Sequence, residues 1–150
     1  MNAHEITIRV LRIETHDSGL FEFDAGGDLA AVSRVHDSDH DLADFVAWFV
    51  DRPGQWWLRN GDVAVLGSHE LAVAAWGRGV IRIHETPEEW FRGGRHGVCV
   101  LLWDAPLDDL FAGVGSIWCD SPTLRQRIVD ALRRWEPRVE LLRRETPHAA

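Results

Sequence analysis

Over residues 63–142 short apolar runs alternate with segments that carry helix-start signals, and this alternation limits the possible folds more than any other feature. Four runs rich in Val, Ile and Leu are predicted strands, with a fifth candidate at the end: Val63–Leu66, Val80–His84, Val98–Trp103, Val114–Cys119 and Val139–Leu142. Strands that alternate with helices are joined by right-handed crossovers and lie largely parallel. We therefore expect a mainly parallel four- to five-stranded sheet with short crossover helices.

Two of the intervening segments begin with clear helix signals. Thr86-Pro87-Glu88-Glu89 is a capping box with proline at the first helical position, and Gly93 follows as a stop. Ser121-Pro122 opens the last predicted helix, which places Leu124 and Ile128 on one apolar face. These signals support the strand–helix–strand interpretation of the second half.

The first third predicts an antiparallel β-meander followed by a helix. Apolar residues alternate with polar ones over 6–10, and further short runs follow at 20–23 and 29–35. After Ser38, apolar residues recur at helical spacing up to Pro53-Gly54; they are Leu42, Phe45, Val46, Phe49 and Val50. Asn60-Gly61 is a strong hairpin signal. It predicts that Trp56–Arg59 pairs antiparallel with Val63–Leu66.

The chain has 150 residues, which favours a single α/β domain. We divide it into the meander and helix (1–54), the hairpin strand and βαβ sheet (55–145) and a polar tail (146–150). Its longest apolar run, Val98–Trp103, is far shorter than the roughly 20 residues that span a bilayer. The first residues lack the pattern of a signal peptide, and the two cysteines form no C-x-x-C pair. We expect a cytoplasmic protein with reduced thiols and no membrane segment.

The formal net charge is −8, and the chain contains no lysine. A mostly anionic surface repels nucleic acid, so nucleic-acid binding is disfavoured except through the arginine-rich segment after residue 120. The arginines of the last helix form either a solvated face or a patch for an acidic partner, including a second copy; they are Arg125, Arg127, Arg133 and Arg134. The lack of lysine also removes the usual Schiff-base nucleophile and the P-loop cation.

The strand ends supply the candidate site residues, because ligands of open α/β sheets bind beyond the carboxyl ends of the strands. Glu85, Asp104 and Asp120 follow three predicted strands, and together they could hold magnesium and orient a phosphate. The same residue types also cap helices, which is the structural alternative. Gly67-Ser68 could present backbone N–H groups to an anion or, alternatively, supply a serine N-cap. No other cofactor is indicated.

A glutamate after one strand and an aspartate two strands later resembles the Toprim domain of primases and topoisomerases, over about residues 62–120. Toprim domains place a glycine directly after the glutamate and an Asp-x-Asp pair after the later strand. In this chain Glu70 is followed by Leu71, and Asp104 by Ala105-Pro106. The resemblance implies a phosphate-handling magnesium domain, and we carry over no catalytic residue from it.

The segment from His36 to Asp41 combines two histidines with acidic residues, which are possible ligands for zinc or manganese. Its position before a predicted helix gives the alternative that Ser38 and the aspartates act as caps. Distant ligands usually complete such a metal site, and the sequence identifies none.

Tryptophan is unusually frequent, with 8 in the chain. Four tryptophans near apolar helical faces are predicted to be core: Trp48, Trp76, Trp90 and Trp135. Trp56 and Trp57 are adjacent on a predicted strand and point to opposite faces. With Arg59 they are candidate partner-binding residues, because exposed tryptophan and arginine are common at interface hot spots, while core packing is the alternative.

No complete catalytic motif occurs in the sequence. We therefore expect a non-catalytic protein-binding or regulatory module, with a protein partner or a homo-oligomer. The alternative is a magnesium-dependent, possibly degenerate Toprim-like enzyme domain that handles phosphate with Glu85, Asp104 and Asp120.

Overall fold

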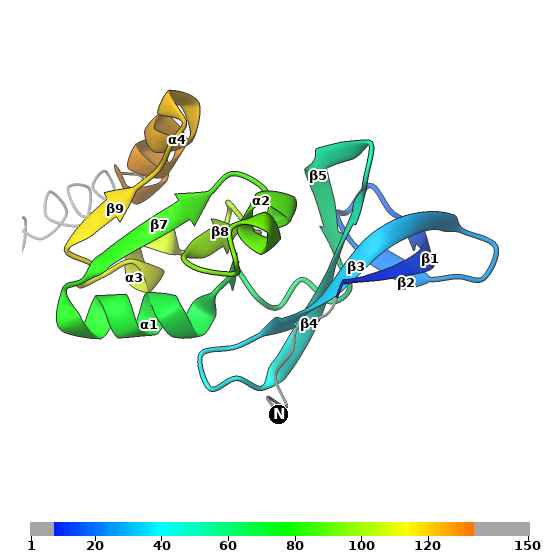
Figure 1. The fold of residues 1–150 in the computed structure, drawn as a ribbon, viewed down its shortest axis with the longest axis horizontal. Coiled ribbons are helices and arrows are strands. Elements are labelled where there is room, and N and C mark those ends of the chain that lie inside the picture. Colours follow the sequence, from blue (N-terminus) through cyan, green and yellow to red (C-terminus); the bar gives the residue numbers. More distant parts are fainter. Residues whose placement is uncertain (1–7, 134–150) are drawn as a thin grey trace, which may run out of the picture.

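A computed structural model describes residues 8–133 and contains two β-sheets with helices packed around the second (Figure 1). The first sheet has the strand order β2-β1-β3-β4-β5, and all its pairings are antiparallel. Its strands are β1 (Arg9–Thr15), β2 (Phe21–Phe23), β3 (Asp28–His36), β4 (Leu42–Phe49) and β5 (Arg52–Leu58). The first third does contain the predicted antiparallel strands, and the first of them begins at Arg9. The predicted meander order is wrong, because β1 lies between β2 and β3, and β3 pairs with β1 rather than with β2.

The predicted helix over residues 38–50 is wrong, because this segment contains β4, which lies between β3 and β5. Its side chains alternate between two environments. Val46 and Trp48 pack toward the second half of the chain, whereas Ala47 and Phe49 pack among residues of the first sheet. A strand covered on both faces has a near-continuous apolar sequence, and such a run also satisfies helical spacing. Tertiary packing decides in favour of the strand.

The predicted hairpin at Asn60-Gly61 is also wrong, because β5 pairs with β4 and remains in the first sheet. The carboxylate of Asp44 in β4 explains this arrangement. It is 1% exposed and accepts hydrogen bonds from the N–H groups of Phe45 at 2.8 Å, Asn60 at 2.9 Å and Asp62 at 3.0 Å. The loop after β5 is thereby held against β4 and leads on to the second sheet.

The second sheet has the order β6-β8-β7-β9. Its strands are β6 (Val65–Leu66), β7 (Val80–His84), β8 (Val98–Val100) and β9 (Ser116–Trp118). β7 pairs in parallel with β8 and β9, but β6 pairs antiparallel with β8. The mixed α/β class is confirmed, while the sheet is mixed rather than mainly parallel. The candidate strand Val139–Leu142 lies outside the described residues.

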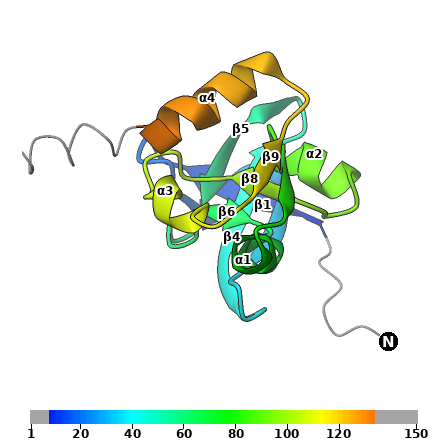
Figure 2. The same cartoon turned by 90° about the vertical axis from the view of Figure 1, so that its left-hand side faces the viewer.

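The helices are α1 (Ser68–Gly77), α2 (Pro87–Arg92), α3 (Leu107–Leu110) and α4 (Pro122–Arg133). Both predicted helix starts are confirmed, because Thr86 Oγ1 accepts the N–H of Glu89 at 3.1 Å and Ser121 Oγ accepts that of Leu124 at 3.2 Å. Apolar residues of α1, α3 and α4 cover the sheet face that carries Ile81. α2 lies on the opposite side of the strands from α3 (Figure 2).

The two halves share one hydrophobic cluster. Val46 and Trp48 of the first sheet contact the same cluster as Leu66, Trp90 and Cys99 of the second half. This packing covers the β6 and β8 part of the second sheet on the side away from α3. Within residues 8–133, no helix is both long enough and apolar enough to cross a membrane.

Candidate functional site

The carboxyl ends of β7 and β9 form a crevice where ligands of open α/β sheets commonly bind. From β7 the chain passes through α2 to β8 on one side, and from β8 it passes through α3 to β9 on the other side. Such a reversal between neighbouring parallel strands is a topological switch point. A cavity of about 350 Å³ lies there, lined by residues of β7, α2 and the start of α4.

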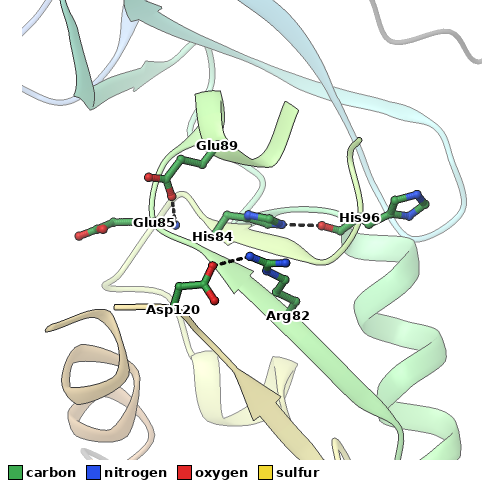
Figure 3. A network of polar contacts seen from close by, with 6 residues as sticks. All are labelled: Arg82, His84, Glu85, Glu89, His96 and Asp120. Atoms are coloured by element: carbon green, nitrogen blue, oxygen red, sulfur yellow. Dashed lines mark hydrogen bonds and ion pairs between the residues drawn. The ribbon is translucent and has the colours of Figure 1, made fainter. Parts of the chain in front are cut away.

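The structure brings Glu85 and Asp120 into this crevice (Figure 3). Asp120 forms an ion pair with Arg82. The backbone N–H of Glu85 donates to Glu89 Oε2 at 3.1 Å, and the ring of His84 bonds through Nε2 to the carbonyl of His96 at 2.8 Å. Several polar groups of the crevice are therefore bonded to other groups of the chain.

Asp104, the third predicted magnesium ligand, lies elsewhere. It lines a separate cavity of about 340 Å³ beside Trp56, Trp103 and Arg127, because the chain after β8 turns toward β5. The guanidinium of Arg127 sits 4.1 Å from the centre of the Trp103 ring. Over the described range no three His, Cys, Asp or Glu side chains are grouped so that they could hold a metal ion. Magnesium binding stays a prediction without an assembled site.

Gly67 and Ser68 lie at the opposite end of the sheet from Asp104, because β6 runs antiparallel to β8. Gly67 has a φ of +84°, and a Cβ there would lie 2.1 Å from the carbonyl oxygen of Gly97, so only glycine fits. Ser68 Oγ donates to the carbonyl of Val65 at 3.3 Å and does not cap α1. Glu70 and Asp104, the pair that resembles Toprim, are accordingly separated.

A cavity of about 430 Å³ lies between the first sheet and the start of α1, and we call it the interface cavity. Its lining residues come from both halves: Arg34, His36, Asp37, His40, Leu66, Gly67, Ser68, His69, Glu70, Val73, Trp90 and Arg95. The rings of His40 and His69 are 4.1 Å apart, and His69 Nδ1 donates to the carbonyl of Ser38 at 2.9 Å. The His36–Asp41 segment and Gly67-Ser68 thus face one cavity, a proximity that their spacing in the sequence does not indicate.

The tryptophans are distributed differently from the sequence prediction. Trp48 and Trp90 are buried as predicted, but Trp76 is 93% exposed. The segment that forms α1 is apolar almost all round, so its periodicity could not identify the buried side, which is occupied by Leu71 and Ala74. Trp135 lies outside the described residues.

Trp57 is only 8% exposed and stacks edge-to-face on Phe49, while Trp56 is half-buried and its Nε1 donates to the carbonyl of Leu101 at 3.1 Å. Arg59 is also half-buried. The structure therefore places this trio largely in packing contacts, and its partner-binding role stays a prediction.

A more exposed surface that carries two large apolar side chains lies on the second sheet. Side chains of β7 and β9 that point away from α3 are uncovered at the β9 end, and we call this surface the open face. It consists of Val80, Arg82, Ser116 and Trp118. Trp118 is 65% exposed and Val80 57%, whereas the β6 and β8 part of the same side is covered by the first sheet and α2.

Comparison with protein-family models, with curated proteins and with solved structures finds no match for this chain. The functional argument therefore depends on the geometry of these surfaces.

Proposed function

We propose that the chain is a non-catalytic protein-binding module, and that the open face binds a second copy of the chain. The observation that carries this proposal is Trp118, which is 65% exposed on a sheet surface whose other part is packed. Large exposed apolar side chains grouped on one surface are typical of interaction sites. Tryptophan and arginine are among the residues most enriched at interface hot spots, and Arg82 lies level with Trp118 on the neighbouring strand. The free thiols of Cys99 and Cys119 fit our proposal that the module works in the cytoplasm.

The second feature that favours self-association is the outer edge of β9. β9 is the last strand in the order β6-β8-β7-β9, so over residues 8–133 its outer edge has no strand partner. Unpaired N–H and C=O groups at such an edge can pair with another chain. Two identical edges related by a two-fold axis pair antiparallel, and the result is a closed dimer.

The side chains of the open face are complementary to themselves in such a pairing. When the two-fold axis passes near Ile117, Trp118 lies opposite Ser116 of the second copy. Val80 lies beside Ser116 on the neighbouring strand, in register. Adjacent strands are about 5 Å apart. The small serine therefore leaves room for the indole of one copy to reach across to Val80 of the other.

The charges near the open face do not oppose this contact. Arg82 is paired with Asp120 in the same chain, so two like charges need not meet at its centre. The whole chain carries a net charge of −8, and this repels a second copy at long range. Since salt screens the long-range repulsion, we expect the dimer to become tighter as ionic strength rises.

Sedimentation equilibrium of the full chain, from micromolar to millimolar concentration, tests the proposal. We expect a reversible monomer–dimer equilibrium that Trp118→Ser and Val80→Ser shift to monomer. The matched control is Val50→Ser, because Val50 is 73% exposed but lies in the turn between β4 and β5. A chain that stays monomeric throughout, or a dimer that Trp118→Ser leaves unchanged, would refute self-association through this face.

A further inference from the structure

We infer that the interface cavity binds a small molecule that carries a phosphate group on a flat apolar body. This site is separate from the open face, so its test does not depend on self-association. The cavity measures about 430 Å³ and is lined by both halves of the chain. Pockets for small ligands commonly measure about 300–1,000 Å³.

The apolar residues of the cavity indicate that the part of the ligand outside the phosphate group is apolar. Leu66, Val73 and Trp90 line it. The indole Nε1 of Trp90 donates to the carbonyl of Gly97 at 2.9 Å, and the side chain is 3% exposed. Because its polar atom is already bonded to the backbone, this indole contributes apolar surface to the cavity. A flat ring or chain of carbon atoms fits such a surface better than a fully hydrated ion does.

The carboxylates that line the cavity are bonded to the protein's own backbone. Asp37 Oδ1 accepts the N–H groups of Asp39 at 2.9 Å and Asp41 at 3.0 Å, which fixes the loop between β3 and β4. Glu70 Oε2 accepts the N–H of Gly97, which fixes the start of α1 against β8. Both acidic groups therefore have a structural task, and their charge is partly balanced by these donors.

Cationic and dipolar groups surround the same space. Arg34 extends from β3 and Arg95 from the loop after α2, so two guanidinium groups come from opposite halves of the chain. Three histidines add further ring nitrogens: His36, His40 and His69. Arginine matches the geometry of phosphate because it can donate two parallel hydrogen bonds. The two guanidinium groups are matched in number by the carboxylates of Asp37 and Glu70, but those carboxylates accept backbone N–H groups, so the arginines and the start of α1 supply the donors that favour an anion.

The start of α1 adds to the arginine pair. Gly67 caps the helix with no side-chain hydrogen bond, so no side chain serves as the N-cap acceptor for the first amides of this ten-residue helix. Donors from three elements, namely β3, the loop after α2 and α1, suit the three terminal oxygens of a phosphate monoester. A carboxylate offers only two.

Three probes distinguish the parts of this inference in titrations followed by backbone amide NMR of the full chain. Phenyl phosphate should bind and shift the amide signals of Ser68, His69 and Glu70. Inorganic phosphate should shift the same signals with weaker affinity, and phenol should leave them unchanged. Benzoate should bind more weakly than phenyl phosphate because it has fewer acceptor oxygens.

Matched arginine variants locate the binding site. Arg34→Gln and Arg95→Gln should each weaken phenyl phosphate about tenfold. Arg125→Gln removes an exposed guanidinium on α4, outside the cavity, and should leave affinity unchanged. Unchanged circular dichroism would show that the variants fold. The inference is overturned if phenyl phosphate does not bind at millimolar concentration, if phenol binds equally well, or if both cavity variants retain full affinity.

Discussion

Replacing Asp44 by alanine tests how the loop between the two sheets is held. The Asp44 carboxylate is 1% exposed and accepts three backbone N–H groups, at 2.8, 2.9 and 3.0 Å. Two of these donors, Asn60 and Asp62, belong to the loop that leads from β5 to β6. A hydrogen bond to a charged group contributes about 1.5–3 kcal/mol, and a buried donor left without an acceptor costs a comparable amount. Because water can reach part of the freed loop, we expect Asp44→Ala to lower the free energy of unfolding by about 3–5 kcal/mol.

Urea unfolding followed by circular dichroism measures this loss, and Asp44→Asn refines it. The amide keeps one acceptor oxygen but places an NH2 group against one of the backbone donors, so its loss should lie between zero and that of alanine. Asp51→Ala is the matched control, since the Asp51 side chain is 82% exposed, and it should change stability by less than about 0.5 kcal/mol. In hydrogen exchange, the Asn60 and Asp62 amides should lose protection in Asp44→Ala. A loss under about 1 kcal/mol with both amides still protected would refute the role assigned to Asp44.

Two further predictions concern buried and exposed side chains. The side chain of Trp57 is 8% exposed and that of Trp76 is 93% exposed. Trp57→Ala should therefore lower the free energy of unfolding by about 3–5 kcal/mol, whereas Trp76→Ala should change it by less than about 0.5 kcal/mol. Urea unfolding compares the two variants, and equal losses would contradict the packing. Burial raises the pKa of the Cys99 thiol. The folded state therefore favours the neutral thiol over the thiolate. The contribution of Cys99 to the free energy of unfolding is complete below the pKa of a free thiol, about 8.5, and is lost as the pH rises above that value. Mass spectrometry after iodoacetamide treatment should show Cys119 modified in the folded chain and Cys99 only after unfolding, and rapid native labelling of Cys99 would contradict this.

Local chemistry predicted the elements whose signals are short and self-contained. The start of α2 follows from Thr86 and Pro87, and the start of α4 from Ser121, because a cap depends on residues within one turn. β4 could not be predicted in this way. Phe45–Phe49 is apolar because both sides of the strand are covered, and the two covering layers come from distant parts of the chain.

The candidate sites were predictable only where topology was correctly assigned. Glu85 and Asp120 follow parallel neighbouring strands and do line one crevice, as the rule for strand ends implies. A parallel β6 would put Gly67 and Asp104 at the same end of the sheet, whereas the antiparallel pairing of β6 with β8 puts them at opposite ends. The exposure of Trp118 depends on how far the first sheet extends over the second, and this cannot be predicted from a short segment of sequence.

The hydrophobic cluster common to both sheets makes the chain difficult to divide. Val46 and Trp48 on one side and Leu66, Trp90 and Cys99 on the other bury each other, so a fragment cut within the loop 59–62 would leave a large apolar surface in water. Each half therefore depends on the other to bury its apolar side chains. A ligand bound in the interface cavity would contact both halves, so its binding energy would stabilise the whole chain against unfolding rather than one half alone.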